Sequence, residues 1–216
     1  MSHGTSNSKG VAILFGEQLD YNIVKKIIDQ NGRFILVLCL LQGNTFLLIN
    51  SYAPNDEKNQ VSFLLEICEV IFNLDCPVDT SFIWGGDFNF IFDIELEASG
   101  GNPKPKTCLI EAIREIMLDL DLCDIWRVRN PDAKKFTWSG KAQGRSSSPN
   151  ITIYRRLDYF LISDELQSYV EQVDIIPAPS TDHSAVTLRI KSLPGVKNGP
   201  SFWKFNNSLI NVNNYI

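Results

Sequence analysis

The stretch FIWGGDFNF at residues 82–90 joins an apolar run, two glycines, and a carboxylate and a carboxamide two positions apart. The apolar run predicts a buried β-strand over 81–86, which the glycines interrupt. Side chains two positions apart on an extended chain point the same way, so Asp87 and Asn89 would lie together. Asp can serve as a base or metal ligand, and Asn can hold a phosphoryl oxygen. The pair indicates a capped turn or a reaction site.

The residues before this stretch predict β-structure. GVAILFG at 10–16 is typical of a strand. The turn dipeptides at 31–32 and 43–44 separate apolar runs, which predicts an antiparallel meander over roughly 23–51. A helix follows, capped by Asn55 or Asp56, since apolar residues recur at helical spacing as far as about residue 74.

The residues after it mix the two kinds of element. A second helix opens at Thr107, whose apolar positions form one stripe. Strands are predicted over 136–139, 151–163, 173–178 and 184–190, with a helical turn over 164–170. Together these elements predict an α/β (α+β) protein with mixed sheets. We expect one domain over 1–192 and a linker or tail over 193–216, which is rich in polar residues, Gly and Pro.

Length and composition bound the class of protein. A chain of 216 residues with 44% hydrophobic residues can bury one substantial core. No segment is long and apolar enough to cross a bilayer, and the N-terminus lacks the apolar part of a secretion signal. Five cysteines without a CxxC motif indicate reduced thiols in an intracellular protein, nuclear or cytoplasmic. Zinc is improbable because the two histidines lie far apart in sequence.

Charge is unevenly distributed along a chain whose net charge is −5. Residues 56–125 carry fifteen acidic and four basic side chains, whereas 127–156 carry only one acidic side chain. The basic residues of the second segment are Arg127, Arg129, Lys134, Lys135, Lys141, Arg145, Arg155 and Arg156. This segment is either a phosphate-facing surface or a solvated loop without a partner, and charge alone leaves both interpretations open.

Two further motifs carry groups suited to chemistry. Asp182 and His183 are adjacent, so their side chains diverge and suit different roles. Asp158 lies among bulky apolar residues, where an unpaired carboxylate is costly to bury, and therefore needs a partner. That partner is Arg155 or Arg156 if the role is structural, or His183 if it is functional.

Tyr52 and Thr137 complete the set of candidates, because each could donate a hydroxyl to a phosphate, although both types are more often core or turn residues. The motifs then occur in the order SYAPN, GGDFN, TW, RRLDYF and TDHSAV. This order resembles the endonuclease/exonuclease/phosphatase superfamily, which includes the apurinic-site endonucleases. The resemblance is closest to the endonuclease domain of LINE-1-like retrotransposon reverse transcriptase proteins, and the segment GPSFWKFNNSL is similar to the join towards the reverse transcriptase.

The resemblance implies a four-layered sandwich of two mixed β-sheets flanked by helices, incomplete at the N-terminus. It also implies a hydrolase that uses Mg²⁺ or Mn²⁺ to cleave a phosphodiester of DNA. Such a protein would bind DNA and no membrane, would act as a monomer, and would be fused to a reverse transcriptase in its relatives.

Roles for individual residues follow from the same resemblance. Asp87 would orient or deprotonate the attacking water or assist the leaving oxygen, while Asn89 and Tyr52 would hold the scissile phosphate. Asp182 would belong to the metal site. The resemblance also implies that His183 pairs with Asp158 and stabilises the transition state. The substrate-binding residues would be Thr137, Arg155 and Arg156.

The sequence departs from the family pattern at its start. The family has an Asn and then a Glu, the principal metal ligand, on its first strands, and neither motif is present. Glu17 and Glu57 do not lie in that context. We therefore expect weaker metal binding, an exposed sheet edge and weak or absent activity in this chain. The alternatives are another phosphoesterase of the superfamily and a non-catalytic remnant that binds nucleic acid.

Overall fold

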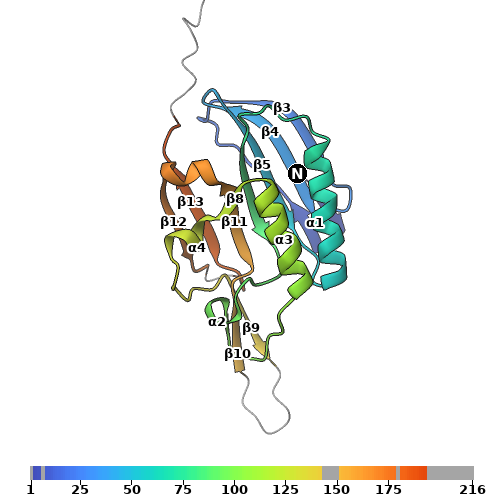
Figure 1. The fold of residues 1–216 in the computed structure, drawn as a ribbon, viewed down its shortest axis with the longest axis vertical. Helices are drawn as coiled ribbons and strands as arrows, with labels where there is room; N and C mark the ends of the chain where they lie inside the picture. The colour runs from blue at the N-terminus through green and yellow to red at the C-terminus, as the bar shows by residue number, and fades with distance from the viewer. Residues whose placement is uncertain (1, 6–7, 143–150, 179–180, 194–216) are drawn as a thin grey trace, which may run out of the picture.

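A six-stranded sheet with the order β3-β4-β5-β6-β11-β8 runs through the centre of the molecule (Figure 1). The computed structural model describes residues 2–5, 8–142, 151–178 and 181–193. The strands are β3 (Tyr21–Ile28), β4 (Phe34–Leu41), β5 (Asn44–Tyr52), β6 (Ser81–Asp87), β8 (Leu122–Asp124) and β11 (Asp158–Ser163). Only the β5–β6 pair is parallel, because a helix connects these two strands, so the sheet is mixed as predicted.

Two helices cover one face of this sheet (Figure 1). Helix α1 (Glu57–Phe72) begins at Asp56, whose carboxylate accepts a hydrogen bond from the Asn59 amide at 3.2 Å. This is the capping interaction that the sequence predicts. Helix α3 (Thr107–Asp119) lies beside α1 and buries Leu109 and Ile113 against the same core. Both predicted helices are confirmed.

Strand β4 shows how the sequence builds cores on both faces of the sheet. All residues from Phe34 to Cys39 are buried, and successive side chains point to opposite faces. Phe34, Leu36 and Leu38 pack towards α1 and α3. Ile35, Val37 and Cys39 pack into a second core on the other face. A continuous apolar run is therefore needed here, because neither face of this strand meets water.

Three small sheets lie outside the central sheet. They are β1 (Ser2–Thr5) with β2 (Ser8–Val11), β12 (Val170–Ile176) with β13 (Ala185–Ile190), and β7 (Ala98–Ser99) with β10 (Ile151–Arg155) and β9 (Trp138–Ala142). Three short helices lie between strands of the central sheet and strands of these small sheets: α2 (Ile94–Glu97), α4 (Ile125–Arg129) and the 3₁₀ helix η1 (Asp164–Tyr169). Val11, Val173 and Ile175 share the second core with β4, so β2 and β12 pack on the face opposite α1 and α3. Figure 1 shows β9 and β10 projecting from the lower end of the molecule.

Several boundaries differ from the sequence prediction, since the strands predicted over 136–139 and 173–178 lie at Trp138–Ala142 and Val170–Ile176. The strand predicted over 10–16 ends at Val11, because the Ala12 carbonyl accepts a hydrogen bond from the Asn50 side chain at 2.9 Å instead of continuing a ladder. The run 151–163 forms two strands that belong to different sheets, with Arg156 and Leu157 between them. The predicted tail lies outside the described residues, apart from Leu193 at its start.

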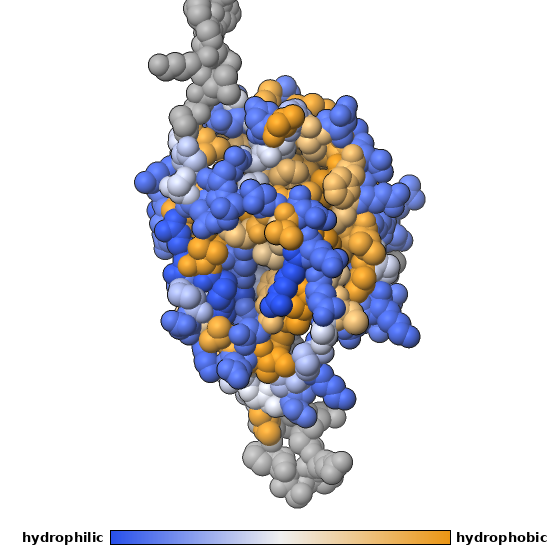
Figure 2. Space-filling model, in the orientation of Figure 1, coloured by the Kyte–Doolittle hydropathy of each residue, from blue (hydrophilic) through white to orange (hydrophobic). Residues whose placement is uncertain are grey.

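The surface and the thiols are consistent with the sequence analysis. None of the helices in the described part of the chain has the length and apolar character needed to span a bilayer. Figure 2 shows apolar side chains scattered among polar ones over α1 and α3, where Leu65, Phe72 and Leu118 are exposed. All five cysteines are free thiols. Burial raises the pKa of the Cys39 thiol to about 11, which keeps it protonated.

Candidate active site

Three predicted site residues are aligned across neighbouring strands of the central sheet. Tyr52 at the end of β5 pairs in register with Asp87 at the end of β6. Asp87 pairs in turn with Asp158 at the start of β11. Residues paired in register on adjacent strands point to the same face of a sheet. The register therefore gathers a phenol and two carboxylates that lie far apart in the sequence.

The two glycines before Asp87 make this close arrangement possible. A Cβ atom on Gly86 would lie 2.0 Å from the Ser51 carbonyl oxygen, and its φ of 150° is unfavourable for other residues. A Cβ atom on Gly85 would lie 2.7 Å from the ring of Phe160. Glycine is thus required where β6 passes between β5 and β11, immediately before the site.

A tight turn after β6 positions Asn89. Its amide donates to Asp87 Oδ1 at 2.9 Å, and its side-chain Nδ2 donates to the Ala53 carbonyl at 2.8 Å. Asn89 has a φ of 53°, a left-handed conformation that costs a non-glycine residue about 1 kcal/mol. The sequence offered a capped turn and a reaction site as alternative interpretations of the Asp87–Asn89 pair. The pair does form a capped turn, and the same turn lies at the candidate site.

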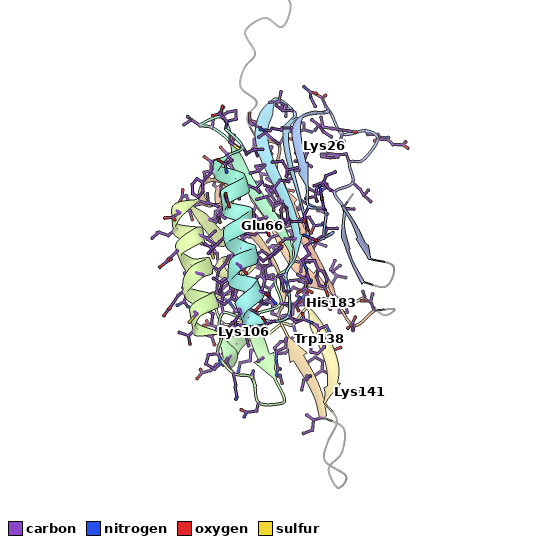
Figure 3. The ribbon with its side chains drawn as sticks, turned by 90° about the vertical axis from the view of Figure 1, so that its right-hand side faces the viewer. Lys26, Glu66, Lys106, Trp138, Lys141 and His183 are labelled. Carbon is purple, nitrogen blue, oxygen red and sulfur yellow. The ribbon has the colours of Figure 1, made fainter. Side chains whose placement is uncertain are left out.

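The fifth residue of the site comes from the chain segment before β13. His183 Nδ1 lies 2.9 Å from Asp158 Oδ2, so the functional partner proposed for Asp158 is the one that the structure provides. Potential ligand atoms of Asp87, Asp158 and His183 all lie within 4.8 Å of one another. In Figure 3, His183 and Trp138 lie close together near the end of the sheet. The cluster therefore combines two residues of the central sheet, on β6 and β11, with one residue of the segment before β13.

Burial and the two neighbouring carboxylates tune the protonation of the cluster. Partial burial, followed by the charge of Asp158, raises the pKa of Asp87 from 3.8 to about 6. The hydrogen bond to Asp158 is the main cause of a raised pKa at His183. Asp87 is thus placed to exchange a proton near neutral pH, and the imidazole to carry positive charge.

An open cavity of about 430 Å³ gives a ligand access to these groups. Its lining includes Tyr52, Asp87 and Asp158 from the central sheet, and Ser184 and Val186 from the segment that enters β13. The polar side chains in this lining suit a charged substrate better than an apolar one.

The donor set of the cluster fits a divalent cation. Two carboxylates face each other across the β6–β11 pair, and their mutual repulsion contributes to the raised pKa of Asp87. A bound cation would relieve that repulsion, and carboxylate oxygens are the ligands that Mg²⁺ and Mn²⁺ prefer. The group of residues that the structure brings together is Asp87, Asp158 and His183.

Asp182 lies beside this group and not within it. Its side chain is exposed and accepts a hydrogen bond from Trp138 Nε1 at 2.9 Å. The main chain of the same segment pairs with β9, where the Ser139 amide donates to the Asp182 carbonyl at 3.0 Å. The role of Asp182 as a metal ligand therefore stays a prediction.

Thr137 has a different place from the one predicted. Its side chain is fully buried, and its hydroxyl oxygen accepts hydrogen bonds from the amides of Leu157 at 2.8 Å and Asp158 at 3.0 Å. A hydroxyl in this position is unable to meet a DNA backbone at the surface. The correction has a simple physical reason, since the amides at the start of β11 need acceptors and Thr137 supplies one.

Arg156 is likewise not a substrate-binding side chain in this structure. It is fully buried and forms ion pairs with Glu97 and Asp124. Its neighbour Arg155 donates to the carbonyls of Ser99 and Gly100, both at 3.0 Å. Two buried carboxylates require a buried cation, and Arg156 satisfies that requirement.

Most of the predicted basic surface is occupied in the same way. Arg127 pairs with Glu97 at 3.2 Å, Arg129 donates to carbonyls at 167 and 170, and Lys135 pairs with Asp174. Lys134 and Lys141 are exposed. Arg145 lies outside the described residues. Most basic side chains of this segment therefore have partners within the protein, which differs both from a phosphate-facing surface and from a solvated loop without a partner.

Two side chains that no sequence motif indicated contact the site from the side of the helices. Gln60 and Lys106 both donate to the Asn89 carbonyl, at 2.9 and 3.0 Å. A signal for Gln60 is present in the sequence, because 60, 64, 67 and 71 share one helical face and Gln60 is its polar member. Lys106 precedes a helix after a Pro-rich segment, and nothing local distinguishes it from Lys104.

Comparison with known proteins places these observations in context. No family model matches the chain. The chain is 29% identical over 209 residues to the transposon TX1 uncharacterized 149 kDa protein of Xenopus laevis. The match covers 97% of this chain but only 15% of that protein, so the chain corresponds to a small part of it.

Several solved nucleases share the fold. The AP endonuclease LMAP from Leishmania major has a TM-score of 0.59 at 22% identity over 77% of this chain and 56% of that one. The endonuclease domain of TRAS1, a telomere-specific non-LTR retrotransposon, has a TM-score of 0.57 at 13% identity, covering 87% and 80% of the two chains. The 3'-5' exonuclease NExo from Neisseria meningitidis has a TM-score of 0.53 at 17% identity, covering 81% and 71%.

These similarities confirm the fold predicted from the motifs. The mixed α/β structure of this chain has the same fold as these solved nucleases. The transposon protein is similar in sequence to nearly the whole of this chain. Within the described residues, two separate sheets, β1–β2 and β12–β13, contribute to the second core where the prediction had one mixed sheet.

Proposed function

We propose that this chain is a divalent-metal-dependent endonuclease of retrotransposon type, which hydrolyses phosphodiester bonds of DNA. The observation that carries the proposal is the register Tyr52–Asp87–Asp158, with His183 held 2.9 Å from Asp158. Phosphoryl transfer needs positioning and neutralisation of charge more than covalent assistance. The cluster offers both beside an open cavity.

Each residue of the cluster has a role in this proposal. Asp87, which lies between Tyr52 and Asp158 in the sheet register, accepts the proton of the attacking water. Asn89 keeps one side-chain N–H on Ala53 and turns its second N–H, with the Tyr52 hydroxyl, to the scissile phosphate. The imidazolium of His183, stabilised by Asp158, balances the charge that develops on the phosphoryl oxygens.

A bound Mg²⁺ or Mn²⁺ would supply Lewis-acid polarisation of the phosphate. Asp87 and Asp158 would hold the ion, and Asp182 is the further ligand that the resemblance implies. We further propose that the substrate is DNA and that the protein acts as a monomer in the nucleus or cytoplasm. Fusion to a reverse transcriptase is proposed on the resemblance of the segment after 193.

A second candidate function is nucleic-acid binding without cleavage. One observation favours it, because Asp158 already forms a hydrogen bond with His183. Within the three-residue cluster, this leaves Asp87 as the carboxylate without a direct hydrogen bond to a basic side chain. A cation held by so few free anionic ligands would bind weakly. Weak cleavage is therefore the expected behaviour of the proposed enzyme.

The test is nicking of supercoiled plasmid DNA by the purified chain with Mg²⁺ or Mn²⁺. We expect nicking that EDTA abolishes and that Asp87→Asn lowers by at least about 100-fold, the usual effect of losing a general base. Salt-sensitive DNA binding without any metal-dependent nicking would refute the nuclease and support the second candidate.

A further inference from the structure

The turn that carries Asp87 and Asn89 is held from the helix side of the sheet by a side chain outside all the motifs. Gln60 lies in the first turn of α1 and is fully buried. Its Nε2 donates to the carbonyls of Phe88 at 3.3 Å and Asn89 at 2.9 Å. A buried amide in this position fixes the direction of both peptide groups, because its own geometry is fixed by the helix.

Lys106 completes this contact from the residue before α3. Its ammonium donates to Gln60 Oε1 at 2.7 Å, to the Asn89 carbonyl at 3.0 Å and to the Asn55 carbonyl at 3.2 Å. An ammonium group has three N–H donors, and all three have an acceptor here. In Figure 3, Lys106 lies on the side of the helices, whereas His183 lies on the opposite side of the strands.

The partners of Lys106 are unusual for a surface lysine. No ion pair links its ammonium to a carboxylate within the described part of the chain, and its three acceptors are neutral oxygens. Two of these acceptors lie in the segments that leave the site, Asn55 after Tyr52 and Asn89 after Asp87, and the third is on α1. Lys106 therefore links the two segments to each other and to the helix, while the charges of Glu57 and Asp56 act on it without a direct ion pair.

The conformation of Asn89 explains why such coupling is needed. Its left-handed backbone has a small cost for a residue with a side chain, and the hydrogen bonds around Asn89 offset that cost. Gln60 and Lys106 hold the Asn89 carbonyl. The amide of Asn89 is held by Asp87, and its side chain is held by the Ala53 carbonyl. Releasing the carbonyl would let the turn relax and move both functional side chains.

We propose that Gln60 and Lys106 are positioning residues, which set the geometry of the Asp87–Asn89 turn and thereby the rate of phosphodiester cleavage. The proposal rests on the proposed nuclease function for its effect on rate, but not for its effect on the turn. A group that acts through positioning changes kcat more than KM, because binding of the DNA uses other contacts.

The first experiment measures kcat and KM for nicking by the full chain with Mg²⁺. We expect Lys106→Met to lower kcat by about 10- to 100-fold with KM changed less than about twofold, the usual scale for a supporting residue. Lys106→Arg keeps a cation with several donors and should restore part of the loss. Lys104→Met makes the same charge change at an exposed position two residues away and should have no effect. A wild-type kcat in Lys106→Met, or a change in KM alone, would overturn the proposal.

The second experiment separates this inference from the proposed function. Amide hydrogen exchange of Asn89 reports the turn directly, whether or not the chain nicks DNA, because that amide is bonded to Asp87. Lys106→Met should speed its exchange by about tenfold or more while amides of β4 keep their protection, and Lys104→Met should not. If the wild type fails to nick, the function is refuted and the exchange result decides the inference. Unchanged exchange at Asn89 would overturn it.

Discussion

Arg156 and Asp158 lie two positions apart in RRLDYF, yet they belong to two charge clusters with opposite properties. Arg156 is fully buried, and its guanidinium is surrounded by acceptors on Glu97 and Asp124. Asp158 is only partly buried, and it shares its cluster with a second carboxylate and an imidazole beside an open cavity. The charged groups of the Arg156 cluster find their partners within the protein. The Asp158 cluster has ligand atoms that could bind a cation.

The difference shows how to separate a structural charge cluster from a functional one. The Glu97 carboxylate is fully satisfied, because it also accepts from the Tyr159 hydroxyl at 3.1 Å and the Phe92 amide at 2.8 Å. In the other cluster, burial and then the neighbouring charge of Asp158 raise the pKa of Asp87 to about 6. Charged groups that repel one another beside a cavity indicate a site for binding or chemistry. Buried charged groups that all have partners indicate a role in the fold.

The largest effect should be a loss of stability when the buried cluster of Arg156, Glu97 and Asp124 loses its cation. Arg156→Met leaves Glu97 and Asp124 buried without their shared cation, which should lower the free energy of unfolding by about 3–5 kcal/mol. Chemical denaturation measures this loss. The matched control is Arg155→Met, which removes the same charge at a partly exposed position and should cost less than about 1 kcal/mol. Equal losses in the two variants would contradict the comparison.

The next effect should come from the open cluster and appear in activity instead of stability. His183→Ala removes the partner of Asp158 and should lower plasmid nicking by about 100- to 1,000-fold, or roughly 3–4 kcal/mol of transition-state stabilisation. Its unfolding free energy should change by less than about 1 kcal/mol, because Asp158 can be solvated. Wild-type nicking by His183→Ala would show that the imidazole has no part in the reaction.

The smallest effect is a gain in stability that depends on pH. The pKa of Asp87 is about 6 in the folded chain and 3.8 in its ordinary state, so ionisation above pH 6 costs the folded state more than the unfolded state. Asp87→Asn should therefore stabilise the metal-free chain by about 2–3 kcal/mol at pH 8.

That advantage should disappear as pH falls from 6 towards 3.8, because Asp87 is protonated in both states below this window. Denaturation of both variants in EDTA at pH 8 and pH 4 measures the difference. An equal difference at the two pH values would show that the ionisation of Asp87 does not oppose folding.

The sequence identified the elements and the motif residues well where the signal is local. The meander and both long helices depend on short-range periodicity and turn chemistry, and they lie where predicted. The position of Asp87 and Asn89 after an apolar strand was also readable, because the strand, the glycines and the turn are contiguous. The assignments that failed, Thr137 and Arg156, concern polar side chains whose direction depends on partners far away in sequence.

By itself the sequence determined the mixed α/β class, the order of the motifs and the identity of the groups available for chemistry. Only the tertiary structure decided which of these groups meet, because pairing of β5, β6 and β11 sets one register for Tyr52, Asp87 and Asp158. It also decided that Lys106 reaches the site while Lys104 stays exposed. The physical reason is that a local pattern fixes the face of an element, whereas the partner of a charged side chain depends on the packing of distant elements against that face.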